Sequence, residues 1–493
     1  MRNDTHRRLK IEGQPLRKQK PAVRVLNWRE TFVGFDLRTA QIEAARCIQC
    51  PDAPCQQACP VGNDIPGAFR LLEQGDVIGA ANIFRETSNL PEMCGRLCPQ
   101  ERLCEGDCVV AFAIRPDDIG AQPAVAIGKL ESYVTDYQRR ELGGWPMPEV
   151  APPSGCRVAV VGAGPAGLAA AEQLAVQGHS ITLFDAWSEP GGVLLYGIPN
   201  FKMEKHILDQ YVAHLGQLGI EFTGNTFIGR DVTIDELFER GYDAVFLGHG
   251  ASLGNRLEIP GVDLPGVIMA TEFLVRGNLA PEQLPSWMRD PLPEAGRVVV
   301  IGGGDTSMDC VRTAIRLGAR EVTCAYRRTE AEQLGREEER VHAREEGVRF
   351  EYLAAPLRIE ASPSSEGRVA RARFARMALG DPDSSGRRRP EPTGEEFEVE
   401  ADVVVIAIGY GGDEAVVQMI EGHPPGRSLI KVDPETFQTA RPGVFAGGDC
   451  VNGADLVVTA LADGRRAAQA IDHYLETLPK SRPSTIVGLR TRS

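Results

Sequence analysis

The stretch that decides the fold is RVAVVGAGPAGLAAAEQLAVQG, residues 157–178. It begins with a β-branched apolar run, continues through a glycine-rich turn, and ends in an alanine-rich apolar segment. This pattern predicts a buried strand, a tight turn and a helix that packs on the strand. HSITLFDAW (179–187) predicts the next strand. The same unit returns as RVVVIGGGDTSMDCVRTAIRLGAREVTCAYRR (297–328), so we expect two α/β domains with parallel sheets.

The first glycine loop follows the strand VAVV directly and opens the next helix. Glycines there permit the turn and the approach of a pyrophosphate, which the helix N-terminus attracts. Asp185 ends the next strand, where an acidic residue can hold ribose hydroxyls. The context favours a dinucleotide site over a merely tight turn. The residues expected to contact the dinucleotide here are Gly162, Ala163, Gly164, Pro165, Ala166 and Asp185.

Two further segments favour FAD as that dinucleotide. FAGGD (445–449) repeats a strand followed by Gly-Gly-Asp, the pattern in which two-domain flavoproteins place a ribityl-binding aspartate. GGVLLYGIPNFK (191–202) offers glycine-rich backbone that a planar ring can approach. Ordinary turn glycines are the alternative for both segments. The further FAD contacts expected are Gly192, Gly197, Lys202, Gly250, Gly448, Asp449 and Thr459.

The second glycine loop, within 302–307, follows VVVI and has a serine at its third small position. Where an NAD site carries an acid, the next strand ends in Arg327-Arg328. Arginine pairs bidentately with a 2′-phosphate, so NADPH is favoured over NADH. The alternative is that both arginines only solvate a strand end. The expected NADP contacts are Gly302, Gly303, Gly304, Asp305, Thr306, Arg327, Arg328, Arg336 and Gly409.

Eight of the twelve cysteines fall between Cys47 and Cys108, in two blocks of four. The first block ends in Cys59-Pro60 and resembles ferredoxin cluster runs. Each [4Fe–4S] cluster needs four protein ligands, so eight thiolates suit two clusters. Structural zinc, which four thiolates can also hold, is the rival interpretation. Scattered buried thiols are a third, and the regular short spacings disfavour it.

The order of the motifs predicts a helical iron–sulfur domain, then an FAD domain into which an NADP domain is inserted. The first 40 residues are expected to form an extended arm, and 381–396 an exposed hairpin loop. The expected domains are 1–144 for the arm and the iron–sulfur domain, 145–156 for a linker, 157–290 for the first segment of the FAD domain, 291–410 for the NADP domain, and 411–493 for the second segment of the FAD domain with a C-terminal tail.

The composition narrows the class of protein. The 493 residues carry a formal net charge of −14, which argues against a nucleic-acid binder. No apolar run approaches the length of a membrane-spanning helix, and the polar, basic N-terminus lacks a signal-peptide core. We therefore expect a cytoplasmic protein without a membrane partner.

Taken together, these motifs resemble the small (beta) subunit family of bacterial NADPH-dependent glutamate synthases over about residues 24–476. Stretches such as NLPEMCGRLCPQERLCEGDC, GGVLLYGIPNFKME and VFAGGDCVNGADLVVTALADGRRAA are the most telling. The same module occurs in ferredoxin–NADP oxidoreductase large subunits and at the N-terminus of dihydropyrimidine dehydrogenase. The resemblance implies one cluster on Cys47, Cys50, Cys55 and Cys108, and another on Cys59, Cys98, Cys104 and Glu131. Cys94 would then be a spare thiol.

The resemblance also implies a function. NADPH would reduce FAD, and electrons would pass through two [4Fe–4S] clusters to a large FMN subunit that makes glutamate from glutamine and 2-oxoglutarate. The alternative is an NAD(P)H–ferredoxin (bifurcating) oxidoreductase large subunit, or another NADPH-dependent electron-input subunit. A third possibility is a non-catalytic, zinc-binding assembly module. No general acid or base is predicted, and His249 is only a candidate near the flavin.

Overall fold

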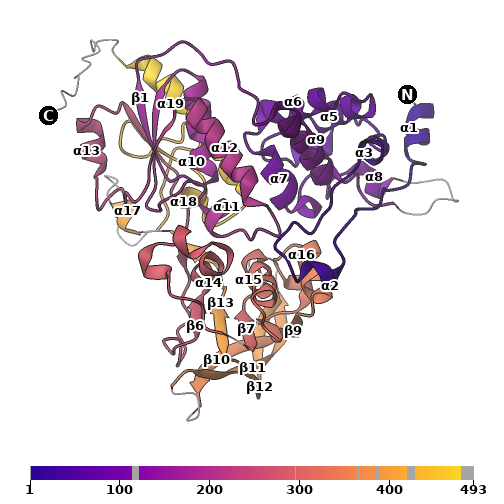
Figure 1. Ribbon diagram of the computed structural model, residues 1–493, viewed down its shortest axis with the longest axis vertical. Helices are drawn as coiled ribbons and strands as arrows, with labels where there is room; N and C mark the ends of the chain where they lie inside the picture. Colours follow the sequence, from indigo (N-terminus) through magenta and orange to yellow (C-terminus); the bar gives the residue numbers. More distant parts are fainter. Residues whose placement is uncertain are drawn as a thin grey trace.

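The computed structural model describes residues 2–113, 122–294, 296–362, 367–382, 386, 388–412, 414–418 and 428–478. Figure 1 shows the helical N-terminal domain beside one sheet domain, with a second sheet domain below both. Within these described ranges, no helix is long and apolar enough to cross a membrane.

The N-terminal domain is all helical. Its elements are α3 (Leu37–Ala44), α4 (Pro54–Gln57), α5 (Ile65–Glu73), α6 (Val77–Thr87), α7 (Pro91–Leu97), η1 (Gln100–Arg102), α8 (Val109–Phe112) and α9 (Ile127–Leu142). Asp64 and Asp76 cap α5 and α6, since each side chain accepts a backbone N–H of the first turn. Phe69 and Phe84 meet edge to face in the core beneath these helices. Cys47, Cys55 and Cys108 lie in the same core.

The first sheet domain is built from both ends of the remaining chain. Its strands run in the order β15 (Val444–Ala446), β4 (Ala244–Leu247), β1 (Arg157–Val161), β2 (Ser180–Phe184) and β3 (Glu221–Thr223), all parallel. Its helices are α10 (Pro165–Val176), α11 (Val193–Tyr196), α12 (Lys205–Gln217), α13 (Ile234–Glu239), α17 (Glu414–Gln418), α18 (Asp449–Asn452) and α19 (Val457–Thr477). The pairing of β15 with β4 closes this domain from a segment about 200 residues downstream, as the motif order predicts.

The second parallel sheet lies between these two halves in the sequence. Its strand order is β6 (Val267–Met269), β13 (Val403–Ile406), β7 (Arg297–Ile301), β8 (Glu321–Tyr326) and β9 (Arg349–Tyr352). Helices α14 (Ala270–Asn278), α15 (Asp305–Arg316) and α16 (Glu337–Glu345) belong to it, as do the short turns η2 (Pro281–Gln283), η3 (Ser286–Met288) and η4 (Glu330–Glu332). The expected fold class, an inserted α/β domain after a helical domain, is confirmed.

The second sheet domain begins earlier in the chain than the expected boundary between residues 290 and 291. Strand β6 hydrogen-bonds to β13 of the second sheet, and α14 packs on α15, so this sheet already includes residues before 291. Two strands of two residues, β5 (Leu253–Gly254) and β14 (Tyr410–Gly411), pair where the chain leaves the first domain and returns to it. The insertion therefore begins and ends at this ribbon.

An antiparallel sheet covers one face of the second domain. It consists of β10 (Ala354–Ala361), β11 (Val369–Pro382) and β12 (Arg388–Glu400). Phe374 of β11 packs in one core with Val299 and Val404 of the parallel sheet. The expected hairpin loop at 381–396 is thus mostly strand, because Arg388–Glu400 pairs along β11. Arginine–glutamate pairs such as Arg373–Glu398 line the solvent side of this sheet.

The N-terminal arm is only partly extended. It contains two short helices, α1 (Arg2–Arg8) and α2 (Pro21–Arg24), and Lys18 forms a single antiparallel bridge with Phe32. The backbone N–H of Thr31 donates to the carbonyl of Phe201 at 3.1 Å. The arm therefore lies against the loop between α11 and α12 of the first sheet domain.

Candidate functional site

The first glycine loop packs tightly on one side and stays open on the other. Gly162 has φ +99°, and a Cβ there would lie 2.5 Å from the Gly248 carbonyl oxygen. A Cβ on Gly164 would meet only the Cα of Gly192, at 3.9 Å. The open side of Gly164 lies at the N-terminus of α10, where backbone N–H groups attract phosphate. The loop therefore fits the pyrophosphate of FAD.

Asp185 lies directly beside this loop at the end of β2. Its carboxylate accepts the backbone N–H of Ala163 at 2.7 Å and that of Trp187 at 2.8 Å. Burial raises the pKa of Asp185, and these two hydrogen bonds oppose the shift. The structure thus brings Asp185 and the glycine loop together, as predicted from their spacing.

The C-terminal Gly-Gly-Asp segment reaches the same edge of the sheet. Gly448 has φ +78°, and a Cβ there would lie 2.9 Å from the Cβ of Ala166 in α10. Burial raises the pKa of Asp449 to about 6. Thr459 lies in the first turn of α19, and its hydroxyl accepts the Leu456 N–H. Gly448 therefore packs between Ala166 of α10 and Ala460 in the first turn of α19, although these residues are far apart in the sequence.

Two other predicted FAD contacts lie differently. Gly197 follows α11, and a Cβ there would lie 2.8 Å from Val193, so this glycine permits a close turn. Lys202 is buried, and its Nζ lies 2.9 Å from a carboxylate oxygen of Asp309 in α15. Burial raises the pKa of Asp309 to about 7, although Lys202 lowers it. Lys202 thus links the two sheet domains in this structure.

Gly192 and Gly250 both have positive φ angles, which glycine adopts easily and which loops at cofactor sites often use.

The second glycine loop repeats the first. Gly302 has φ +145° and abuts the carbonyl of Ala407, to which Ser307 Oγ donates at 3.3 Å. A Cβ on Gly303 would strike the Tyr326 ring, whereas one on Gly304 would meet nothing within 4 Å. The open side of Gly304 again lies at a helix N-terminus, that of α15. The loop therefore fits the pyrophosphate of NADP(H). Asp305 and Thr306 form the first turn of that helix, and Gly409, with φ +102°, follows β13.

The three arginines expected at the 2′-phosphate are not equivalent. Arg327 is exposed at the end of β8. Arg328 is buried, and its Nε donates to the carbonyl of Arg388 at 2.8 Å. Arg336 is buried as well, and its guanidinium donates to the carbonyl of Arg96 and to Gln100 Oε1 in the helical domain. The Arg336 guanidinium therefore makes a domain contact in this structure, and its expected contact with NADP(H) stays a prediction.

The first cysteine group is Cys47, Cys50, Cys55 and Cys108. Burial raises the pKa of Cys47 to about 11, and the neighbouring Cys108 and Cys50 raise it further. Burial likewise raises the pKa of Cys55 to about 12, with added effects of the other three. A metal cluster compensates such crowding, since thiolates are its ligands. These four thiols therefore lie near one another, and their assignment to one cluster stays a prediction.

The second group lines a small cavity of about 20 Å³. Burial and the neighbouring Glu131 raise the pKa of Cys59 to about 11, and the pKa of Glu131 itself lies well above its usual range, through burial and the proximity of Cys94. Asn63 Nδ2 donates to Glu131 at 3.2 Å. The lining residues relevant to ligation are Cys59, Cys94, Cys98, Cys104 and Glu131. Cysteine sulfur and glutamate oxygen are both suitable donors, so this set fits a cluster.

The described His, Cys, Asp and Glu side chains do not converge in threes on one point as the ligands of a single metal ion would. The first cysteine set is therefore recognised by its place in the core of the helical domain. The second set is recognised by the small cavity that its residues line. Gln100 and Asn63 also line the cavity of the second cysteine set. No motif in the sequence predicted that these two residues lie there. His249 follows β4, and its Cα adjoins the Gly162 turn.

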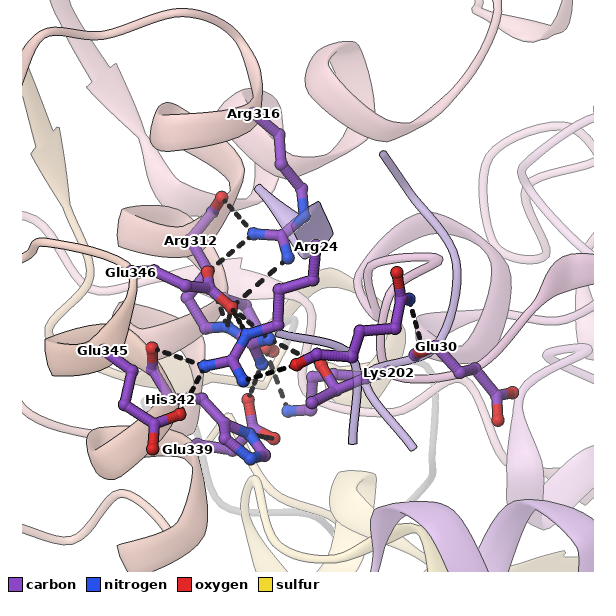
Figure 2. A network of polar contacts seen from close by, with 12 residues as sticks. Arg24, Glu30, Lys202, Arg312, Arg316, Glu339, His342, Glu345 and Glu346 are labelled. Carbon is purple, nitrogen blue, oxygen red and sulfur yellow. Dashed lines mark hydrogen bonds and ion pairs between the residues drawn. The ribbon is translucent and has the colours of Figure 1, made fainter. Parts of the chain in front are cut away.

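A buried ion network joins the arm to both sheet domains (Figure 2). The Glu346 carboxylate accepts hydrogen bonds from Arg24, Arg312 and Arg316 at 2.7 to 2.8 Å. Burial alone would raise the pKa of Glu346, but Arg312 and Arg316 lower it to about 2. The Phe201 ring lies 4.3 Å from the Arg312 guanidinium, which adds a cation–π contact. The network therefore holds α15 and α16 against the loop that carries Lys202.

Two family descriptions match the chain. Residues 24–142 match "Dihydropyrimidine dehydrogenase domain II, 4Fe-4S cluster", and residues 156–464 match "Pyridine nucleotide-disulphide oxidoreductase". The expected iron–sulfur, FAD and NADP(H) cofactor set of an oxidoreductase is confirmed at this level. The residue assignments within it stay predictions.

Individual proteins are similar over most of the chain. The glutamate synthase [NADPH] small chain of Escherichia coli (strain K12) is 41% identical over 92% of this chain and 95% of its own length. The putative oxidoreductase UacF of the same organism is 44% identical over 90% of this chain and 69% of its own. The structure of Mycobacterium tuberculosis FprA in complex with NADPH has a TM-score of 0.54 at 22% identity, and covers 66% of this chain and 85% of its own. The last likeness concerns the fold alone.

Proposed function

We propose that this chain, which belongs to the family of the glutamate synthase [NADPH] small chain, oxidises NADPH at FAD and passes the electrons through two [4Fe–4S] clusters to a partner protein. The observation that carries the proposal is the combination of two open glycine loops and two cysteine groups in one chain. A flavin, when bound, takes two electrons from a hydride donor and releases them singly. The protein's role is binding, orientation and exclusion of water.

For FAD, we assign the pyrophosphate to the loop at Gly162–Gly167 and the ribose hydroxyls to Asp185. Asp449 and the N-terminus of α19 would hold the ribityl chain and flavin. For NADPH, we assign the pyrophosphate to Gly302–Gly304. Arg327 is the preferred partner of the 2′-phosphate, because it is exposed at the end of β8. The domain boundaries follow the sheets, with the NADP domain inserted at the ribbon of β5 and β14.

For the clusters, we assign Cys47, Cys50, Cys55 and Cys108 to one. We assign Cys59, Cys98, Cys104 and Glu131 to the other, with Cys94 a neighbouring thiol. The buried position of Glu131 supports a ligand role, because the hydrogen bond from the neutral Asn63 amide offsets only part of the cost of burying a carboxylate.

The partner we propose is a large, FMN-containing glutamate synthase subunit, which would make glutamate from glutamine and 2-oxoglutarate in the cytoplasm. A specific observation favours a second candidate, an electron-input subunit for another reductase. UacF is as similar to this chain as the glutamate synthase subunits are. An assay of this chain purified together with its co-eluting partner distinguishes the two candidate functions. NADPH oxidation that depends on glutamine and 2-oxoglutarate supports glutamate synthase, and its absence with an intact partner supports the second candidate.

A further inference from the structure

Gln100 holds the loop that carries two cysteines of the second group. Its carbonyl oxygen accepts the backbone N–H groups of Leu103, Glu105 and Gly106 at 2.9 to 3.1 Å. Its side-chain amide donates to the carbonyl of Gly95 at 3.1 Å and lines the cavity of the second group. A Cβ on Gly128 of α9 would lie within the Gln100 side chain. Gln100 therefore packs between the cysteine loop and the helix that supplies Glu131.

Arg336 of the second sheet domain meets Gln100 at this point. Its Nη2 donates to Gln100 Oε1 at 2.9 Å, and its Nη1 donates to the carbonyl of Arg96 at 3.0 Å. The Arg336 side chain is 3% exposed, so its charge lies in a region of low dielectric. Burial lowers the pKa of Arg336, but the carboxylates of Glu339, Glu338, Glu101 and Asp305 outweigh burial and raise it, so the guanidinium stays protonated.

The backbone of Arg336 contacts the second glycine loop. Its N–H donates to Asp305 Oδ1 at 2.9 Å, and Asp305 begins α15 directly after Gly304. One residue thus touches both the turn assigned to NADP(H) and the side chain that packs on the second cysteine group. The sequence separation of 236 residues between Arg336 and Gln100 hides this contact from motif analysis.

We propose that Arg336 and Gln100 are positioning residues that set the reduction potential of the second cluster from the NADP domain. The proposal rests on the proposed function, because it requires a cluster on Cys59, Cys98 and Cys104. Reduction of a cluster adds one negative charge. A buried cation one side chain away favours the reduced state, as net charge and hydrogen bonding set such potentials.

The test is an EPR-monitored redox titration of the holoprotein. Arg336→Gln should shift the midpoint potential of one cluster to more negative values and leave the other unchanged. Arg336→Lys, which keeps the charge, should restore most of the shift. Arg102→Gln is the matched control, since Arg102 lies 3.9 Å from Asp305 but is half exposed. It should leave both potentials unchanged.

Unchanged potentials in Arg336→Gln, with full iron content, would overturn the proposal. So would an equal shift in Arg102→Gln, since that would mean a general surface-charge effect. If Arg336→Gln does not assemble, Gln100→Met removes the acceptor while leaving Arg336 in place. A wild-type potential and EPR line shape in Gln100→Met would equally refute the proposal. Wild-type protein without iron would instead refute the proposed function and leave no cluster to tune.

Discussion

The guanidinium of Arg24 donates from Nε to the carboxylate of Glu346 at 2.7 Å, across 322 positions of the sequence. Both side chains are fully buried, at 1% and 0% exposure. Because Arg312 and Arg316 share the same carboxylate, the arm closes a network formed by α15 and α16. The arm therefore helps to hold the second sheet domain in place (Figure 2).

Replacement of Arg24 by alanine should lower the free energy of unfolding by about 3 kcal/mol, because it removes one partner of a buried ion pair. Denaturant unfolding measures the loss. The matched control is Glu345→Gln. Glu345 also contacts Arg24 but is 44% exposed, so its loss should cost about 1 kcal/mol or less. Equal effects of both variants would contradict a special role for the buried pair.

Glu346 should make the protein sensitive to acid. Its pKa in the folded protein is about 2, below the usual 4.5, so its stabilising effect is complete above about pH 4.5 and is lost as pH falls toward 2. The loss amounts to about 3 kcal/mol for this pKa difference. Unfolding measured from pH 6 to pH 3 should show a shallower fall for Glu346→Gln than for wild type. An identical slope in the two proteins would exclude Glu346 as a source of acid sensitivity.

The ligands of the second cluster can be separated by a pair of variants. Glu131→Ala should lose roughly half of the bound iron, since each [4Fe–4S] cluster carries about four irons. Cys94→Ser should keep its iron content, because Cys94 is assigned no ligand role. Iron analysis and EPR spectra measure both. The opposite pattern, with loss in Cys94→Ser alone, would assign the position to Cys94.

Gly304→Ala should weaken NADPH binding without harming the fold. A Cβ there meets no protein atom within 4 Å, and the φ angle is ordinary, so the methyl group would occupy only the space assigned to the pyrophosphate. We expect a rise in the KM for NADPH of roughly 10- to 100-fold, equivalent to about one lost hydrogen bond to a charged group. FAD content should not change. Gly216→Ala, an equally open glycine in α12, is the control. An unchanged KM in Gly304→Ala would place NADPH elsewhere.

Arg327 should decide between NADPH and NADH. Arg327→Ala should raise the KM for NADPH by roughly 10-fold or more, through loss of a charge-assisted contact, and leave the KM for NADH unaltered. Steady-state assays with both nucleotides measure the ratio. Arg349→Ala, an exposed arginine at the start of β9, should change neither value. A parallel rise for both nucleotides after Arg327→Ala would argue against a 2′-phosphate contact.

The sequence predicted the local features of this molecule well. The two strand–glycine–helix units and Asp185 lie where their spacing placed them, because each depends on neighbours within about 30 residues. The β6 boundary was missed because a strand of three residues carries no periodic signal. The segment 381–396 resembles a solvated loop in sequence because β12, which supplies most of it, is largely exposed.

Long-range partners explain the remaining differences. Lys202 and Arg336 both carry charges that suit a nucleotide, and nothing in their local sequence names Asp309 or Gln100 as their partners. Such contacts form only when the inserted domain packs against the rest of the chain. The grouping of the cysteines could be predicted only in part. Counting the cysteines gives Cys94 as the fourth ligand of the second cluster, whereas the resemblance implies Glu131.

The central claim is that NADPH electrons enter at FAD and reach the clusters of this chain. Anaerobic addition of NADPH to the purified holoprotein, followed by absorbance and EPR, tests it most directly. We predict that the flavin absorbance bleaches and that the signal of a reduced cluster then appears, with NADH much less effective. Protein that carries flavin and iron but shows neither change with NADPH would contradict the claim.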